Sequence, residues 1–152
     1  MRLNFFATVE MGLEKFCLKE LVEEFRVEPI YREHRRGKVF FRGEERHIFE
    51  INYSGRMINR LMILISEEKI ENLRDIIDVV KNIDWSYYIR SKQTFGVKVT
   101  RAGKHDFTSI DVAREVGQVI REQIKNVTGG PPKVDLTNPD VRVVVDIYNE
   151  EL

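Results

Sequence analysis

A short basic turn at residues 101–109 carries the side chains best suited to chemistry in this sequence. Gly103 gives its backbone the freedom to turn, and Lys104, His105 and Thr108 follow just before a predicted helix. The first amides of a helix have no partner within the helix, and the helix dipole attracts negative charge to them. These residues therefore favour binding of a phosphate group or of a nucleic-acid end.

The predicted helix after this turn has two faces of different character. Thr108 and Asp111 have the spacing of a capping box, so the helix should start there. Apolar residues at spacings of three and four predict an inward face: Ala113, Val116, Ile120 and Ile124. A second face with the same spacings is polar and basic: Arg114, Gln118, Arg121 and Lys125. Each cation alone is as well suited to pairing with a nearby acid as to contacting RNA. Only the joint pattern of cations favours RNA.

The charges are segregated along the chain, although the net charge of the 152 residues is zero. Residues 94–133 and 26–42 carry excesses of three and four positive charges, whereas residues 44–84 carry an excess of three negative charges. A basic face can attract phosphates even on a neutral protein. The excess in 26–42 centres on a predicted hairpin loop: Arg32, His34, Arg35, Arg36 and Lys38. Such a loop is either solvated or a second RNA contact, and both interpretations stay open.

Residues for catalysis or metal binding are poorly represented. The histidines at positions 34, 47 and 105 are dispersed, and the single cysteine, Cys17, has no partner for a disulfide or a metal site. Gly103 and Lys104 lack the upstream glycine of a phosphate-binding loop, and the glycines at 129 and 130 stand between a helix and a strand in the wrong order for a nucleotide loop. We therefore expect neither a metal nor a cofactor in this chain.

Nothing in the sequence indicates a membrane protein. The longest apolar run covers residues 61–65, whereas a spanning helix needs about 20 residues. The N-terminus lacks the pattern of a signal peptide, and the composition is 42% hydrophobic and 33% charged, as in soluble globular proteins. We expect a cytoplasmic protein with no membrane partner.

The order of elements predicts two subdomains of mixed α/β (α+β) class, at residues 1–66 and 67–152. In the first, strands at 4–9, 29–32, 38–42 and 61–66 and helices at 12–25 and 44–53 give the β-α-β-β-α-β order of the ferredoxin-like motif, with antiparallel strands and both helices on one face. In the second, a helix at 69–80 and an aromatic element at 83–89 precede two strands. Phe95, Val97 and Val99 alternate in one, with Lys98 on its polar side, and residues 141–148 form another beside it. Trp85 in the aromatic element either packs or stacks on a base.

The run from Phe95 to Gln123 resembles the signature of THUMP domains, through its strand, Arg101, Gly103, His105, Phe107 and the following helix. The ending at residues 134–147, where a polar connection leads into the last strand, is similar as well. Residues 51–61 and 83–85 look like the N-terminal regions of THUMP-containing RNA methyltransferases. The resemblance spans nearly the whole chain.

This resemblance implies an RNA-binding module, preceded by a ferredoxin-like domain, that presents tRNA to a modification domain through the acceptor stem and the 3′ CCA end. The upstream features look most like archaeal tRNA guanine-N2 methyltransferases and related 23S rRNA enzymes. Their S-adenosylmethionine-binding domain and Asn/Asp-Pro-Pro-Tyr motif are missing from this sequence, where Asn138 and Pro139 match only half of that motif. We therefore expect no catalysis by this chain alone and a C-terminal catalytic domain in a longer protein.

Carried over residue by residue, the resemblance assigns RNA contacts to nine positions: Lys98, Arg101, Lys104, His105, Thr108, Ser109, Arg114, Arg121 and Lys125. His105 alternatively only holds the turn. Other functions stay open at this point: a protein-interaction or regulatory domain, the RNA-binding part of a tRNA thiolation or pseudouridylation enzyme, and that of a 23S rRNA methyltransferase. Neutralisation of the basic face by acids would favour the protein-interaction alternative.

Overall fold

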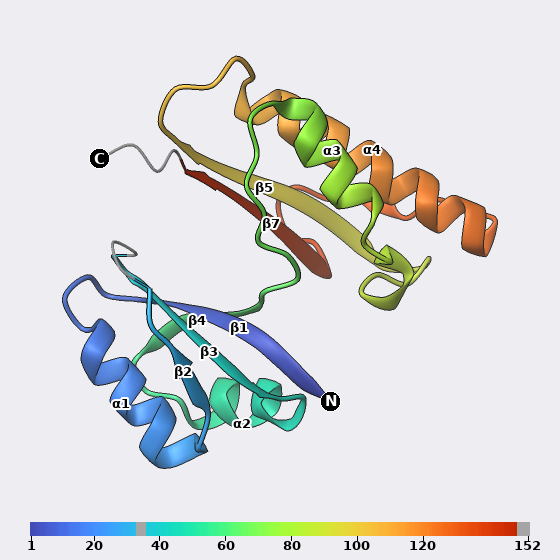
Figure 1. Ribbon diagram of the computed structural model, residues 1–152. Coiled ribbons are helices and arrows are strands. Elements are labelled where there is room, and N and C mark those ends of the chain that lie inside the picture. The colour runs from blue at the N-terminus through green and yellow to red at the C-terminus, as the bar shows by residue number, and fades with distance from the viewer. Residues whose placement is uncertain (33–35, 149–152) are drawn as a thin grey trace. The chain divides into compact units, whose positions relative to one another are not determined.

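The computed structural model describes residues 1–32 and 36–148 and divides the chain into two compact units, Met1–Glu67 and Glu68–Leu152 (Figure 1). The mixed α/β class predicted from the sequence is confirmed. Within the described part of the chain, no helix combines the length and the apolar character needed to cross a membrane.

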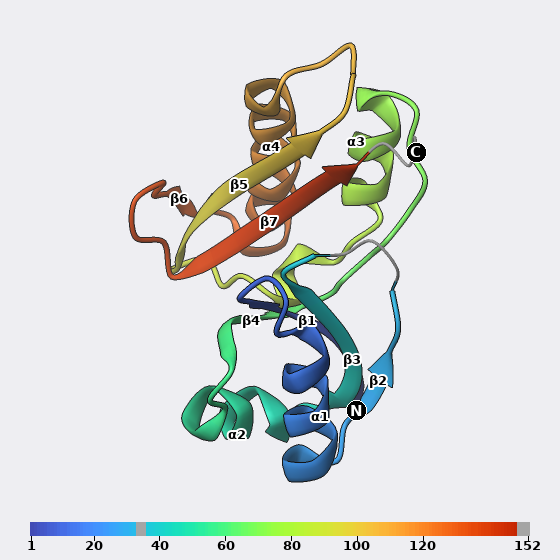
Figure 2. The same ribbon diagram turned by 90° about the vertical axis from the view of Figure 1, so that its left-hand side faces the viewer.

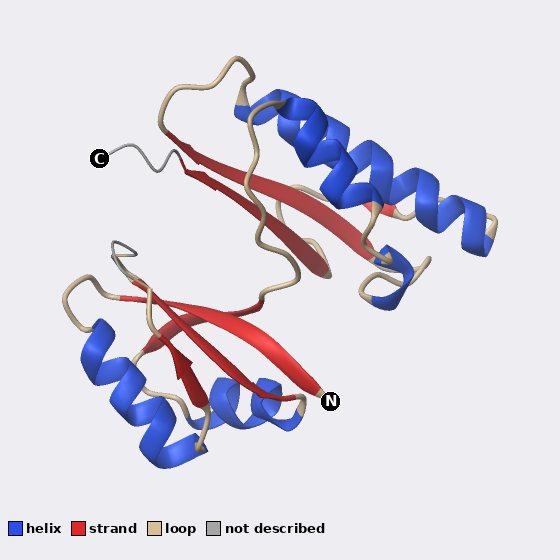
Figure 3. Ribbon diagram, in the orientation of Figure 1, coloured by secondary structure: helices blue, strands red, loops and turns tan. Residues whose placement is uncertain are grey.

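The first unit has the predicted β-α-β-β-α-β order (Figure 3). Its elements are β1 (Arg2–Val9), α1 (Glu14–Phe25), β2 (Glu28–Ile30), β3 (Lys38–Glu44), α2 (Arg46–Ser54) and β4 (Ile58–Ile63). The four strands are antiparallel and lie in the order β2-β3-β1-β4, and both helices cover one face of this sheet. Phe5 and Phe41 stack on that face with ring centroids 5.3 Å apart, inside the core.

Two expectations for the first unit need correction or completion. The last strand was predicted at residues 61–66 but lies at Ile58–Ile63, because its hydrogen bonds to β1 begin at Val9 and set the register. In the basic loop, Arg32 forms an ion pair with Glu67 at 2.6 Å, so it is not a free phosphate ligand. His34 and Arg35 lie outside the described residues.

The second unit is a three-stranded parallel sheet with two helices on one face (Figure 2). Its elements are α3 (Leu73–Lys81), the short 3₁₀ helix η1 (Trp85–Tyr87), β5 (Thr94–Ala102), α4 (Ser109–Thr128), β6 (Lys133–Val134) and β7 (Val141–Tyr148). The strand order is β6-β5-β7, so the predicted neighbours β5 and β7 do pair. Helix α3 begins four residues later than predicted, because Asn72 caps it by accepting a hydrogen bond from the Asp75 amide at 3.1 Å.

The core of the second unit lies between the sheet and its helices. Phe95 on β5 and Val112, Val116 and Ile120 on α4 have no exposed surface. Trp85 is 3% exposed, and its indole N–H donates a hydrogen bond to the Val80 carbonyl at 2.9 Å. Trp85 is therefore a packing residue and is not available to stack on a base.

Candidate nucleic-acid interface

The basic turn lies at the carboxyl ends of two parallel strands. β5 and β7 stay in register up to the pair Ala102 and Tyr148, and the turn joins the end of β5 to α4. Gly103 has a φ of 101°, a left-handed conformation that favours glycine. In open α/β sheets, ligands bind outside the carboxyl ends of the strands, so the turn occupies a favourable edge.

His105 is held in this turn from two sides. Its ring lies 5.1 Å from the ring of Phe107, which is 6% exposed and belongs to the core. On the other side, Arg101 Nη1 lies 3.3 Å from His105 Nδ1. His105 therefore connects the exposed guanidinium of Arg101 to the core. This position fits both interpretations of His105, as a residue that holds the turn and as an RNA contact.

The start of α4 is occupied by its own capping box, as the sequence predicted. The Thr108 hydroxyl donates to the Asp111 carboxylate at 2.7 Å and accepts from the Asp111 amide at 3.2 Å, while the Thr108 amide donates to the same carboxylate at 2.9 Å. The two bonds that the Asp111 carboxylate accepts, first that of the Thr108 amide and then that of the Thr108 hydroxyl, lower the pKa of Asp111. A phosphate at this helix end therefore meets a carboxylate and finds two polar groups of Thr108 already engaged. Ser109 is the half-buried first residue of the helix.

The three cations predicted on α4 differ in how their charge is used. Arg114 donates to Asp111 at 2.9 Å and lies 3.9 Å from Glu115, so two acids neutralise it. The side chains of Arg121 and Lys125 form no hydrogen bond or ion pair with any other residue in the described part of the chain. Both are exposed and one helical turn apart. The positive charge available on α4 is therefore concentrated in its second half.

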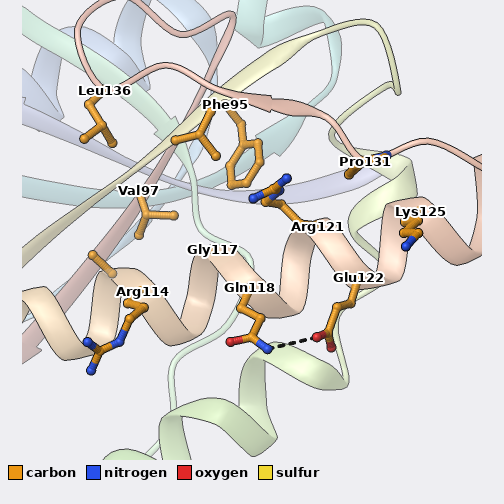
Figure 4. Close-up of a pocket in the computed structure, with 12 residues that line it drawn as sticks. Phe95, Val97, Arg114, Gly117, Gln118, Arg121, Glu122, Lys125, Pro131 and Leu136 are labelled. Atoms are coloured by element: carbon orange, nitrogen blue, oxygen red, sulfur yellow. Dashed lines mark hydrogen bonds between the residues drawn. The ribbon is translucent and has the colours of Figure 1, made fainter.

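Arg121 and Lys125 line a groove of about 530 Å³ between α4 and the segment around β6. Its apolar lining includes Phe95, Val97, Gly117, Pro131, Val134 and Leu136. In Figure 4 the Arg121 side chain extends from the helix toward Phe95 and Pro131, whereas Gln118 and Glu122 lie along another side and share a hydrogen bond of 2.9 Å.

The groove also corrects one prediction about the inward face of α4. Ala113 was expected in the core but lines the groove, and its neighbour Val112 is fully buried instead. Adjacent helical residues differ by about 100° in direction, so the choice between them depends on where the sheet lies. Val116, Ile120 and Ile124 are buried as predicted.

Lys98 lies on a different surface from the cations of α4. It alternates with Val97 and Val99, which pack against the helices, so Lys98 projects from the opposite face of the sheet. On that face Arg142 of β7 stands opposite Gly96, beside the pair Lys98 and Val144. Arg142 was missed by sequence reasoning, since only the parallel pairing of β5 and β7 places it next to Lys98.

Two further features concern the chemistry of the chain. Cys17 has no exposed surface, and burial raises the pKa of its thiol to about 11, so it is a core residue. Within residues 1–32 and 36–148, no group of three or more His, Cys, Asp or Glu side chains is arranged to hold a metal ion.

Comparison with known families and structures assigns a domain family to each of the two units. The model of the THUMP domain matches residues 71–152, more than half of the chain, and the model of the RlmL ferredoxin-like domain matches residues 4–62. A tRNA (guanine(6)-N2)-methyltransferase of Methanocaldococcus jannaschii is 37% identical over 152 residues, which is 99% of this chain and 40% of that protein.

Two other similar proteins match different lengths of the chain. A tRNA sulfurtransferase of Desulfurococcus amylolyticus is 38% identical over 85 residues, which is 55% of this chain and 16% of that protein. The crystal structure of TrmN from Thermus thermophilus superimposes with a TM-score of 0.75 at 28% identity, over 97% of this chain and 43% of that one. The chain thus spans about two fifths of the relatives that match it along its whole length.

Proposed function

Because this chain belongs to the THUMP domain family, we propose that it is an RNA-binding module that presents tRNA, through its acceptor stem and 3′ CCA end, to an RNA methyltransferase domain. That domain would lie in a longer protein, in the part of the relatives that this chain does not match. The module would act in tRNA processing in the cytoplasm. No step of methyl transfer is assigned to this chain.

One observation carries the RNA-binding proposal: Arg121 and Lys125 line the same groove and have no acidic partner among the described residues. A protein-interaction domain whose basic face is neutralised internally would have no preference for phosphate. Of the three cations on α4, only Arg114 is neutralised by acids within the described residues. Two adjacent unpaired cations beside an apolar groove favour a ligand that carries both phosphates and flat rings, as RNA does.

The share of this chain that each relative matches in sequence favours methylation over thiolation as the coupled reaction. The methyltransferase relative matches both units, whereas the sulfurtransferase relative matches 55% of the chain. An S-adenosylmethionine site would belong to the methyltransferase domain, because this sequence has no glycine-rich loop between a strand and a helix in the required order.

In the proposed binding mode, single-stranded RNA follows α4 from the turn to the groove. Ser109 and Lys125 are 16 positions apart, which corresponds to about 24 Å along a helix and is enough for several nucleotides. Arg101, Lys104 and His105 would contact one end and Arg121 and Lys125 the other. Two predicted residues, Thr108 and Arg114, would mainly support the helix start. Lys98 lies on the other face of the sheet, so it would contact RNA only if the RNA chain passes around the edge of the sheet.

The test is a fluorescence anisotropy titration of this chain with tRNA at several salt concentrations. The logarithm of the association constant should fall linearly with the logarithm of salt concentration, by about 0.7 for each single-strand phosphate contacted. Arg121→Ala should reduce this slope by about one such contact. Arg74→Ala removes an exposed arginine of α3 outside the groove and serves as the matched control.

Removal of the 3′ CCA end from the tRNA should weaken binding if the mode is right. Equal affinity for the intact and the shortened tRNA would contradict the role of the CCA end. An affinity that does not depend on salt would contradict RNA binding by these cations altogether.

A further inference from the structure

We infer that the groove beside Gly117 receives the base of one unpaired nucleotide, and that the backbone phosphates flanking this nucleotide contact Arg121 and Lys125. The inference rests on the proposed function and adds the class of ligand that the groove accepts. The proposed function involves phosphates bound along the basic face of α4, and the inference adds one unstacked base bound in the groove.

Gly117 is the first observation that supports this inference. It lies in the middle of the 20-residue helix α4, where glycine is the least favourable residue after proline. Its φ is not positive, and a Cβ added at this position would meet no atom within 4 Å. Packing and backbone conformation within the described structure therefore give no reason for a glycine here. A ligand that closely approaches the helix backbone is a physical reason for a glycine at such a position.

The lining of the groove matches the shape and polarity of a base. Val134 and Leu136 are 48% and 76% exposed and stand across the groove from the helix, while the half-buried Val97 and the fully buried Phe95 belong to the sheet below it. Exposed apolar surface of this kind suits the face of a nucleobase, since stacking on apolar and aromatic side chains tolerates any base. At about 530 Å³ the groove is of small-molecule size, which fits one nucleotide and not a duplex.

The charges at the rim are complementary to a nucleotide as well. Arg121 extends into the groove toward Phe95, and Lys125 follows one turn later, so both cations stand beside the apolar lining (Figure 4). Glu122, the only acid that lines the groove among residues 1–32 and 36–148, accepts a hydrogen bond from Gln118 at 2.9 Å. A nucleotide with its base against Gly117 therefore finds cations for its phosphates at the same rim.

The experiment fills the groove without changing its charge. Gly117→Leu should weaken binding of an RNA hairpin with an unpaired 3′ CCA tail about tenfold and leave the affinity for the same hairpin with a blunt end unchanged. A hairpin whose tail lacks bases but keeps the sugar-phosphate chain should bind the wild-type chain more weakly than the CCA tail does. With this abasic tail, Gly117→Leu should cause no further loss.

Stability measurements keep this test separate from a folding defect. Gly117→Leu and the smaller Gly117→Ala should both melt at or above the wild-type temperature, because leucine and alanine are better helix formers and the site has open space. Gly117→Ala should lose less affinity for the tailed hairpin than Gly117→Leu.

Three outcomes would overturn the inference. Unchanged affinity of Gly117→Leu for the tailed hairpin, with weaker binding by Arg121→Ala, would exclude the groove but leave RNA binding intact. An equal loss for the tailed and the blunt hairpin would show that the groove does not select an unpaired nucleotide. No binding of either hairpin by the wild-type chain would overturn the proposed function itself, and the groove inference with it.

Discussion

The basic turn at residues 101–109 and the groove beside Gly117 belong to the same unit, yet they use positive charge differently. At the turn, the helix end is closed by Thr108 and Asp111, and the next cation, Arg114, pairs with that same Asp111. The groove is lined by Arg114 as well, but its two other cations, Arg121 and Lys125, have no ion-pair partner among the described residues. The number of positive charges is therefore a poor guide to an anion site. What matters is whether those charges are already satisfied within the protein.

The largest expected effect is on the groove. Reversing its two unpaired cations with Arg121→Glu and Lys125→Glu should weaken tRNA binding roughly 100-fold at moderate salt, because two phosphate contacts are lost and two repulsive charges are added. Anisotropy titrations measure the affinity. Arg74→Glu with Lys81→Glu on α3 gives a control with the same change in net charge. If the control loses as much affinity, general charge and not the groove determines binding.

The turn should respond to Thr108→Ala in stability more than in binding. Loss of the N-cap should lower the free energy of unfolding by about 1 kcal/mol, since the Asp111 amide loses its acceptor. Denaturant titrations measure this loss. Affinity for tRNA should change less than twofold, and a loss of affinity larger than the loss of stability would mean that the hydroxyl contacts RNA directly.

Measuring stability as a function of pH isolates the contribution of the Asp111 carboxylate to folding. Because the pKa of Asp111 is lower in the folded than in the unfolded chain, its contribution to stability is present above the unfolded pKa, near 3.8, and is lost as the pH falls through the folded value. Stability of the wild type should therefore fall more steeply with decreasing pH, below about pH 4, than that of Asp111→Asn.

Asp135 offers a matched control for that titration, because the amides of Asn138 and Thr137 lower its pKa in the same way. Asp135→Asn should remove a similar share of the acid sensitivity. An identical pH dependence of wild type and Asp111→Asn would contradict the capping account of Asp111.

The smallest expected effect is that of Arg114→Gln on RNA binding. Since Asp111 and Glu115 already neutralise this arginine, its loss should change the tRNA affinity less than threefold, whereas Arg121→Gln should cause a clearly larger loss. Parallel anisotropy titrations compare the two variants. Equal losses would remove the distinction between paired and unpaired cations on α4.

Much of this architecture could be predicted because its signals are local. The capping box of Thr108 and Asp111 and the periodicity of α4 depend on neighbours in sequence, and both appear in the structure. The start of β4 could not be predicted, since it depends on the register with β1. Features that need two distant segments were also missed: Ala113 faces the groove only because the β6 segment stands opposite, and Arg142 lies on the same sheet face as Lys98 only through parallel pairing.

The state of Cys17 makes this chain suitable for site-directed labelling. A fully buried thiol with a pKa of about 11 is almost entirely protonated at neutral pH, and it resists alkylating reagents. A cysteine introduced at an exposed position such as Gln118 would then be the only reactive thiol, with the native one left in place. Cross-linkers or fluorophores attached there would report on bound RNA from the rim of the groove, in a protein whose core is unchanged.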